Sequence, residues 1–220
     1  PVQTAVKTLL TEKNKPEVPR RNNSVKIMTL AGEVSKPSKE QGKVATGISP
    51  TWTGTDMKRI AFTFDDGPHP KLTDRLLELL DKENVKATFF VVGKQAEHYP
   101  ELIQRIFEHG HELANHTYTH RNLSRLSHLE FDHELDQTHR IVQAITDQPM
   151  KFFRPPGGQY DGQVVARAND LGYRMVMWNI APGDHANPPA ELIKTRVLRN
   201  LHENGVVLLH SGIENTLAAL

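Results

Sequence analysis

The 220-residue chain contains no cysteine, so disulfide frameworks, cysteine-based zinc sites and cysteine nucleophiles are all excluded. It has no long apolar run, because stretches such as Val206–Leu209 are far shorter than the ~20 residues that a membrane helix needs. Net charge is nearly absent, since 27 Lys and Arg stand against 26 Asp and Glu. A formal charge of +1 argues against a general nucleic-acid or membrane-surface binder, and the length suits one domain with or without an arm.

The charge is unevenly distributed along the chain. Residues 1–55 hold nine basic and four acidic residues, a net +5, and the remainder carries −4. This first segment has scattered Pro, Ser, Asn and Lys and one strand-like patch, residues 25–30. Residues 1–56 are therefore expected to form a mostly irregular N-terminal arm or linker. A solvated tether is the simpler interpretation of its charge, and attraction to an acidic polymer is the alternative.

A domain is predicted over residues 57–220. The chain opens on Pro1 rather than Met, and residues 214–220 have the pattern of a helix that is just beginning. We therefore expect a processed or shortened chain whose domain is truncated at its carboxyl end.

From residue 59 onward, strand-like and helix-like segments alternate. Runs rich in β-branched and aromatic residues predict strands over 60–64, 87–92, 112–115, 152–153, 175–178 and 206–209. Amphipathic periodicity predicts helices over 72–83, 100–110, 164–171 and 190–201, and Ser127 with Glu130 forms a capping box for a helix running toward Ile145. This order is typical of an α/β fold with parallel strands, either open or closed into a barrel.

Polar side chains follow these strands where each one ends: Asp65 and Asp66, His116 and His120, Arg154, Asp184, and His210. The carboxyl ends of parallel strands meet at one rim of such a fold, so the side chains are expected to form one active site.

Asp65 and Asp66 are adjacent, so they share a site only if the backbone turns there, as Gly67 allows. An acidic turn that caps the next helix is the alternative.

His116 and His120 are spaced to bind one divalent metal from a helical or tightly wound turn, and a carboxylate such as Asp66 would complete the site. Taken alone, this spacing is more often incidental.

Arg154 precedes a proline, which holds its backbone extended, and two glycines follow, which permit close approach of a backbone N–H to a developing oxyanion. An ordinary Pro/Gly loop is the alternative. His210 ends an apolar strand and is either a packed histidine or a general acid whose imidazolium is held by a carboxylate at Asp184.

Four motifs occur in order: Thr63–Pro68 (TFDDGP), His116–His120 (HTYTH), Arg154–Gly158 (RPPGG) and Leu208–His210 (LLH). Together they resemble the polysaccharide deacetylase family, the NodB-homology domain of carbohydrate esterase family four, over about residues 57–220. The resemblance implies an α/β fold, a distorted TIM-like (β/α) barrel of seven to eight parallel strands. It also implies metal-dependent removal of acetyl groups from glycans.

The resemblance further implies a role for each site residue. Asp65 would be the general base, with Arg154 orienting it, and His210 the general acid, with Asp184 tuning it. Asp66, His116 and His120 would hold the metal. Leu208 and Trp178 would line the pocket for the acetyl methyl, and the Gly157 N–H would face the oxyanion.

Two positions depart from the family's pattern. Gly157 stands where the family often has an aromatic residue, and His185 follows Asp184 where the family usually has Trp. The groove wall and the pocket lining are therefore expected to differ here.

Two histidines and one carboxylate suit Zn²⁺, with Co²⁺ or Ni²⁺ as alternatives. Peptidoglycan N-acetylglucosamine is the favoured substrate, and chitin or its oligomers and acetyl-xylan are alternatives. A non-catalytic carbohydrate-binding module is the alternative of a different class. The expected protein is an exported monomer of the periplasm or cell envelope that binds a glycan, with no nucleic-acid partner and no transmembrane segment.

Overall fold

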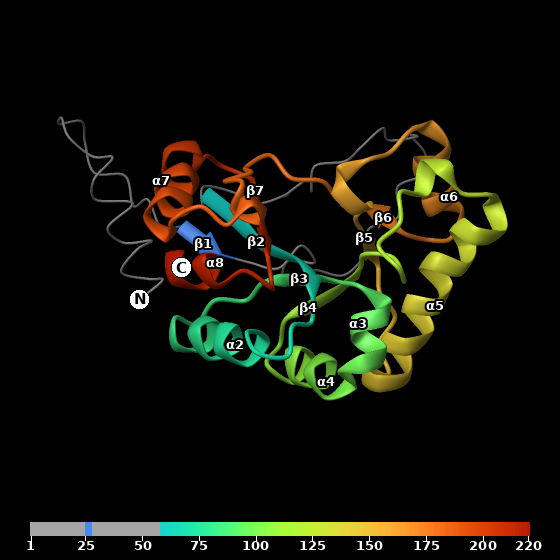
Figure 1. Ribbon diagram of the computed structural model, residues 1–220, viewed down its shortest axis with the longest axis horizontal. Helices are drawn as coiled ribbons and strands as arrows, with labels where there is room; N and C mark the ends of the chain where they lie inside the picture. The colour runs from blue at the N-terminus through green and yellow to red at the C-terminus, as the bar shows by residue number, and fades with distance from the viewer. Residues whose placement is uncertain (1–24, 28–57) are drawn as a thin grey trace.

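The computed structural model describes residues 25–27 and 58–220, and within them a parallel sheet runs through the middle of the molecule (Figure 1). Its seven strands are β1 Val25–Ile27, β2 Lys58–Gly67, β3 Thr88–Val91, β4 Glu112–Asn115, β5 Phe152–Phe153, β6 Arg174–Met175 and β7 Gly205–His210. The spatial order is β1-β2-β3-β4-β5-β6, and β7 pairs with β2. β1 lies inside the strand-like patch of the predicted arm; the rest of that arm falls outside the described residues.

The sheet curls until its two ends meet. At one end β7 pairs with β2 from Ile60 to Asp65. At the other end, the segment after β6 first pairs with β5 and then with β7. The Val176 N–H donates to the Phe153 carbonyl of β5 at 2.8 Å, and Ile180 forms a parallel bridge to Val207 of β7. The predicted parallel α/β fold, distorted from a regular barrel, is therefore confirmed. The predicted strand 175–178 is shorter because this segment leaves β5 to reach β7.

Helices lie around the outside of the sheet (Figure 1). They are α2 Thr73–Lys82, α3 Gly93–His98, α4 Pro100–Glu108, α5 His128–Thr146, α6 Gly162–Asp170, α7 Ala190–Asn200 and α8 Glu214–Ala219. Short 3₁₀ turns are η1 Leu123–Arg125, η2 Pro156–Gly158 and η3 Asp184–Ala186. α5 begins at the predicted capping box, in which the Ser127 and Glu130 side chains each accept from the other's backbone N–H.

α3 was not expected from the sequence, because its six residues show no apolar periodicity. Its first residue, Gly93, lies where a Cβ would be 2.5 Å from Thr138 Oγ1 of α5 and 2.7 Å from the Tyr118 ring. The helix is therefore set by close tertiary packing that only a glycine permits.

Two apolar clusters lie on opposite faces of the curled sheet. The larger one joins strand residues such as Phe64 and Phe89 to helix residues such as Leu135 and Ile106. The smaller one holds buried strand residues and Val176 only, so it fills the inside of the curl: Ala61, Phe90, Ala114, Phe152, Val176 and Val206. Side chains two residues apart share a face of a strand. The inner face therefore changes from apolar to polar toward the carboxyl ends of the strands: Thr63 and Asp65 in β2, His116 after β4, Arg154 after β5, and His210 in β7.

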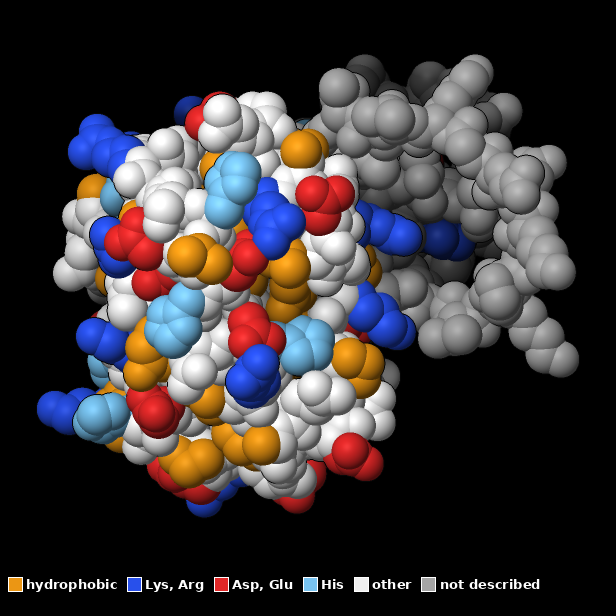
Figure 2. Space-filling model, turned by 90° about the vertical axis from the view of Figure 1, so that its right-hand side faces the viewer, with side chains coloured by type: hydrophobic (Ala, Val, Ile, Leu, Met, Phe, Trp, Pro, Cys, Tyr) orange, Lys and Arg blue, Asp and Glu red, His pale blue; other side chains and the backbone are white. Residues whose placement is uncertain are grey.

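Figure 2 shows the molecule from the right-hand side of Figure 1. Charged side chains of both signs are interspersed on the described part of this face, and no continuous basic stripe crosses it. Among the helices of the described residues, none combines the length and the apolarity that crossing a membrane requires.

Replacing Ile180 tests the closure of the sheet. Ile180 is 1% exposed and bridges to β7, so Ile180→Ala is expected to lower the free energy of unfolding by about 2–5 kcal/mol. Urea denaturation measures the change. Leu129→Ala, at a side chain that is 83% exposed, is the control and is expected to stay within about 0.5 kcal/mol. Equal effects of the two substitutions would contradict the closure.

Candidate active site

The two adjacent carboxylates share one site because the backbone leaves the strand geometry at Asp66. This residue has a φ of 67°, and the pairing of β2 with β3 shifts register between Phe64 and Gly67. The turn therefore begins one residue before the predicted Gly67. His116 Nε2 lies 3.7 Å from Asp65 Oδ2 and 3.4 Å from Asp66 Oδ1, so one imidazole faces both carboxylates.

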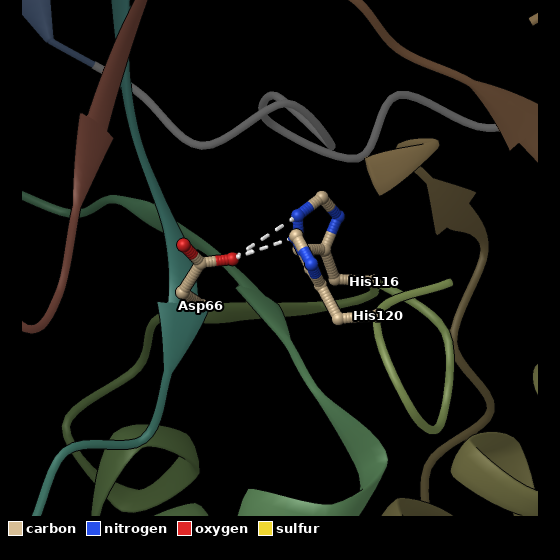
Figure 3. Close-up of side chains that lie close together, drawn as sticks. All are labelled: Asp66, His116 and His120. Atoms are coloured by element: carbon tan, nitrogen blue, oxygen red, sulfur yellow. Dashed lines mark ion pairs between the residues drawn. The ribbon is translucent and has the colours of Figure 1, made fainter. Parts of the chain in front are cut away.

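Asp66, His116 and His120 form a compact group of potential metal ligands (Figure 3). Asp66 Oδ1 lies 3.4 Å from His116 Nε2 and 3.1 Å from His120 Nε2, and the two rings are 5.0 Å apart. His116 Nδ1 donates to the Arg154 carbonyl oxygen at 2.8 Å, which leaves the lone pair of Nε2 directed at the group. Two imidazoles and one carboxylate, oriented in this way, fit a divalent metal of the zinc type.

The electrostatics keep Asp66 in the ionised form that a metal ligand requires. Burial alone would raise the pKa of Asp66, but hydrogen bonds and charge interactions with His116 and His120 hold that pKa far below its ordinary value. The hydrogen bond to Asp66 in turn raises the pKa of His120. A proton on His120 therefore competes with a metal ion for the same imidazole nitrogen.

The turn that carries the two histidines is tight and non-helical. Thr117 and His120 adopt the left-handed conformation, with φ of 67° and 59°. Asn115 Oδ1 accepts from the Thr117 N–H at 2.9 Å, and Thr117 Oγ1 accepts from the His120 N–H at 3.0 Å. These hydrogen bonds are the physical cause of the turn and offset the backbone strain at its two left-handed residues.

Glu134 of α5 supports this turn, and the sequence analysis missed it. Its carboxylate is 3% exposed and accepts from the N–H groups of Tyr118 at 2.9 Å and Thr119 at 2.7 Å, and from the Thr119 hydroxyl. A signal was present, because Glu134 falls on the apolar stripe of α5 between Phe131 and Leu135. A charged residue on a buried helix face needs hydrogen-bond partners. The partners of Glu134 are the N–H and hydroxyl donors in the turn that carries His116 and His120.

Arg154 is fully buried and makes an ion pair with Asp65 at 2.6 Å, from Nη1 to Oδ1. The same Nη1 donates to Thr63 Oγ1 at 2.8 Å, and Nε donates to the Val176 carbonyl at 3.1 Å. The guanidinium lies over the Phe90 ring, 4.0 Å from its centroid. Asp65 is thereby held in one orientation, with its other oxygen toward His116.

His210 and Asp184 form a second pair on the opposite side of Asp65. Asp184 Oδ1 lies 2.9 Å from His210 Nδ1, and Asp184 Oδ2 accepts from the His210 backbone N–H at 2.8 Å. Burial alone would lower the pKa of His210, but the hydrogen bond and charge of Asp184, followed by the charges of Asp65 and Asp66, raise it. Asp65 and His210 are register partners on β2 and β7, so a buried carboxylate and a protonatable imidazole stand side by side.

The three residues expected to contact substrate lie around this rim. Gly157 is exposed in η2 with a φ of 61°. Trp178 packs against the neighbouring Gly158, where a Cβ would be 2.5 Å from the indole Cη2, and its ring lies 5.4 Å from Arg154 Cζ. Leu208 is buried two residues before His210, on the same face of β7. The structure thus brings all ten sequence-predicted site residues to one end of the sheet.

A buried carboxylate beside an imidazole and a group of potential metal ligands, on the carboxyl ends of a curled parallel sheet, is an arrangement suited to metal-dependent hydrolysis. Residues 53–176 match the family described as polysaccharide deacetylase. The chain belongs to this family, whose active members are metal-dependent hydrolases that deacetylate glycans.

Relatives at about one-third identity carry two different substrate names. A Bacillus cereus peptidoglycan-N-acetylglucosamine deacetylase is 36% identical over 152 residues, which cover 69% of this chain and 55% of the relative. This chain therefore spans just over half the length of that relative. A Sinorhizobium fredii chitooligosaccharide deacetylase is 34% identical over 161 residues, covering 73% of this chain and 75% of the relative.

Among solved structures, a Bacillus anthracis protein described as a pseudoenzyme of carbohydrate esterase family four matches with a TM-score of 0.71. It is 32% identical and covers 74% of this chain and 57% of its own. The fold is therefore shared by family members with and without activity. Function is inferred from the site residues rather than from the fold.

Glu134→Ala is expected to weaken zinc binding about 10–100-fold, because three donors in the turn between His116 and His120 lose their shared acceptor. Titration of the chelator-stripped protein with zinc measures the affinity. Glu101→Ala, an exposed glutamate of α4, is the control and is expected to bind zinc as the wild type does. Unchanged zinc affinity in Glu134→Ala would remove this residue from the support of the site.

Asp184→Asn is expected to lower the pKa of His210, because the substitution removes the charge that raises it. At a pH between the two pKa values, the wild-type imidazole is protonated and that of the variant is neutral. A pH titration of the histidine resonances by NMR, in metal-free protein, measures both values. An unchanged or higher pKa of His210 in the variant would contradict the assignment of Asp184 as its partner.

Proposed function

We propose that this chain hydrolyses the acetamide of N-acetylglucosamine units in peptidoglycan and releases acetate. The observation that carries the proposal is the register pairing of Asp65 with His210, which places a proton acceptor and a proton donor beside the Asp66–His116–His120 triad. Family membership supports the reaction class. The name of the Bacillus cereus relative supports peptidoglycan as the substrate.

The proposed reaction begins with Asp65, which accepts a proton from water as the water oxygen bonds to the acetamide carbon. Arg154 occupies Asp65 Oδ1, which leaves Oδ2 for this proton. His210 then donates its proton to the leaving nitrogen as the C–N bond breaks, and the products are acetate and a free sugar amine. A protonated His210 before catalysis requires the adjacent Asp184 carboxylate.

Asp66, His116 and His120 would hold the metal, for which we propose Zn²⁺, with Co²⁺ or Ni²⁺ as alternatives. When bound, such a metal supplies Lewis-acid stabilisation and lowers the pKa of water to about 7. The backbone N–H of Gly157 would donate to the oxyanion, and Leu208 and Trp178 would contact the acetyl methyl. A Cβ at Gly157 would meet only the Gln159 side chain, at 3.8 Å, so the space beside this N–H is open.

We further propose an exported monomer that acts in the cell envelope or periplasm, with residues 57–220 as the catalytic domain and residues 1–56 as its arm. A deacetylase for a cell-wall polymer has its substrate outside the cytoplasm. The second candidate substrate is a chitin oligomer, which the name of the Sinorhizobium fredii relative favours. Acetyl-xylan is the third.

Asp65→Asn is expected to lower acetate release at least about 100-fold, because the amide cannot accept the proton from water. Acetate is measured with peptidoglycan, N-acetylglucosamine oligomers and acetyl-xylan, with chelator and after zinc is restored. Chelation is expected to abolish the activity and zinc to restore it. Asp136→Asn, at an exposed aspartate of α5, is the control and should retain full activity.

Three outcomes would contradict parts of this proposal. Equal acetate release by the wild type and Asp65→Asn would refute the base assignment. Faster release from chitin oligomers or acetyl-xylan than from peptidoglycan would change the substrate. Glycan binding without acetate release under any metal would favour a carbohydrate-binding module.

A further inference from the structure

A second group of metal-ligand side chains lies on the far side of Asp65 from the triad. One ligand atom from each of Asp184, His185 and His210 lies within 4.8 Å of those of the other two. The ring of His185 lies 5.7 Å from that of His210 in an edge-on arrangement. Among the described residues, the only other such group is the Asp66 triad.

The Asp184 carboxylate is fixed through Oδ2 by neighbouring donors, and its Oδ1 faces His210. Oδ2 accepts from the His210 backbone N–H at 2.8 Å and from the Thr216 hydroxyl at 2.7 Å. Oδ1 faces His210 Nδ1 at 2.9 Å, with the exposed His185 side chain next to it. A carboxylate held through one oxygen, with the other directed at imidazole nitrogens, is the arrangement that supporting hydrogen bonds give to metal ligands.

We propose that Asp184, His185 and His210 bind a second zinc-type divalent ion and that this ion inhibits the enzyme. Its ligand set of two nitrogens and one oxygen matches the chemistry of zinc rather than that of calcium or magnesium. The ion takes the place of the proton shared by His210 Nδ1 and Asp184 Oδ1, and that proton passes to solvent. His210 then keeps only the Nε2 proton of a neutral imidazole, which is a much weaker acid toward the leaving amine than an imidazolium.

The inhibition depends on the proposed function, whereas the binding does not. Metal content therefore tests the site separately. Chelator-stripped full-length protein is equilibrated with zinc, and bound zinc per chain is measured by dialysis and metal analysis. The wild type is expected to bind two ions, and His185→Ala and His116→Ala one each. The doubly substituted chain is expected to bind none.

His128→Ala removes an exposed histidine at the start of α5 and is the matched control, with two ions expected. The second site would be refuted if the wild type bound one ion and His185→Ala also bound one. Loss of the second ion in His128→Ala as well would show non-specific histidine binding and would equally overturn the proposal.

Acetate release at rising free zinc tests the inhibition. Wild-type activity is expected to rise as the first site fills and then fall, and His185→Ala is expected to shift the fall to at least about tenfold higher zinc. The fall is measured relative to each protein's own maximum, because the His185 ring packs against that of His210. Inhibition of both proteins over the same zinc range would refute the inhibitory role. If neither protein released acetate, the proposed function would fail, and the zinc count would still decide the second site.

Discussion

The active site depends on one ion pair inside the curled sheet, between Arg154 and Asp65. The guanidinium is fully buried, lies on Phe90 of the inner apolar cluster and donates to Thr63 and to the Val176 carbonyl. It therefore joins β2 and β5 to the segment after β6 at the level where the interior changes from apolar to polar. Removing one member of such a buried pair leaves the other uncompensated, at a cost of about 3–5 kcal/mol.

Arg154 also links Asp65 to His116, one of the candidate metal ligands. Its side chain holds Asp65, and its carbonyl oxygen accepts from His116 Nδ1. The position of the carboxylate and the orientation of one metal ligand are thus set by a single residue. The proline after Arg154 keeps this backbone extended, which allows the carbonyl and the side chain to serve different partners.

Local patterns in the sequence were sufficient to predict most of the framework. Apolar runs predicted the strands, and the capping box predicted the start of α5. The resemblance to the deacetylase family pointed to the ten residues that the structure brings to one end of the sheet. Longer-range effects were not predictable in this way. Glu134, the packing of α3 at Gly93 and the change of partner before Ile180 each depend on contacts between segments far apart in the chain. The pairing of β1 with β2 is of the same kind.

Thr216 of α8 holds the carboxylate that faces His210, so the proposed acid and its partner come from elements that follow β6 in the chain. The proposed base and the candidate metal ligands come from β2 and from the turn after β4. A ribosome working from the amino end therefore releases the residues proposed for water activation well before those proposed to protonate the leaving amine. The proposed proton path is complete only in a chain that includes β7 and α8.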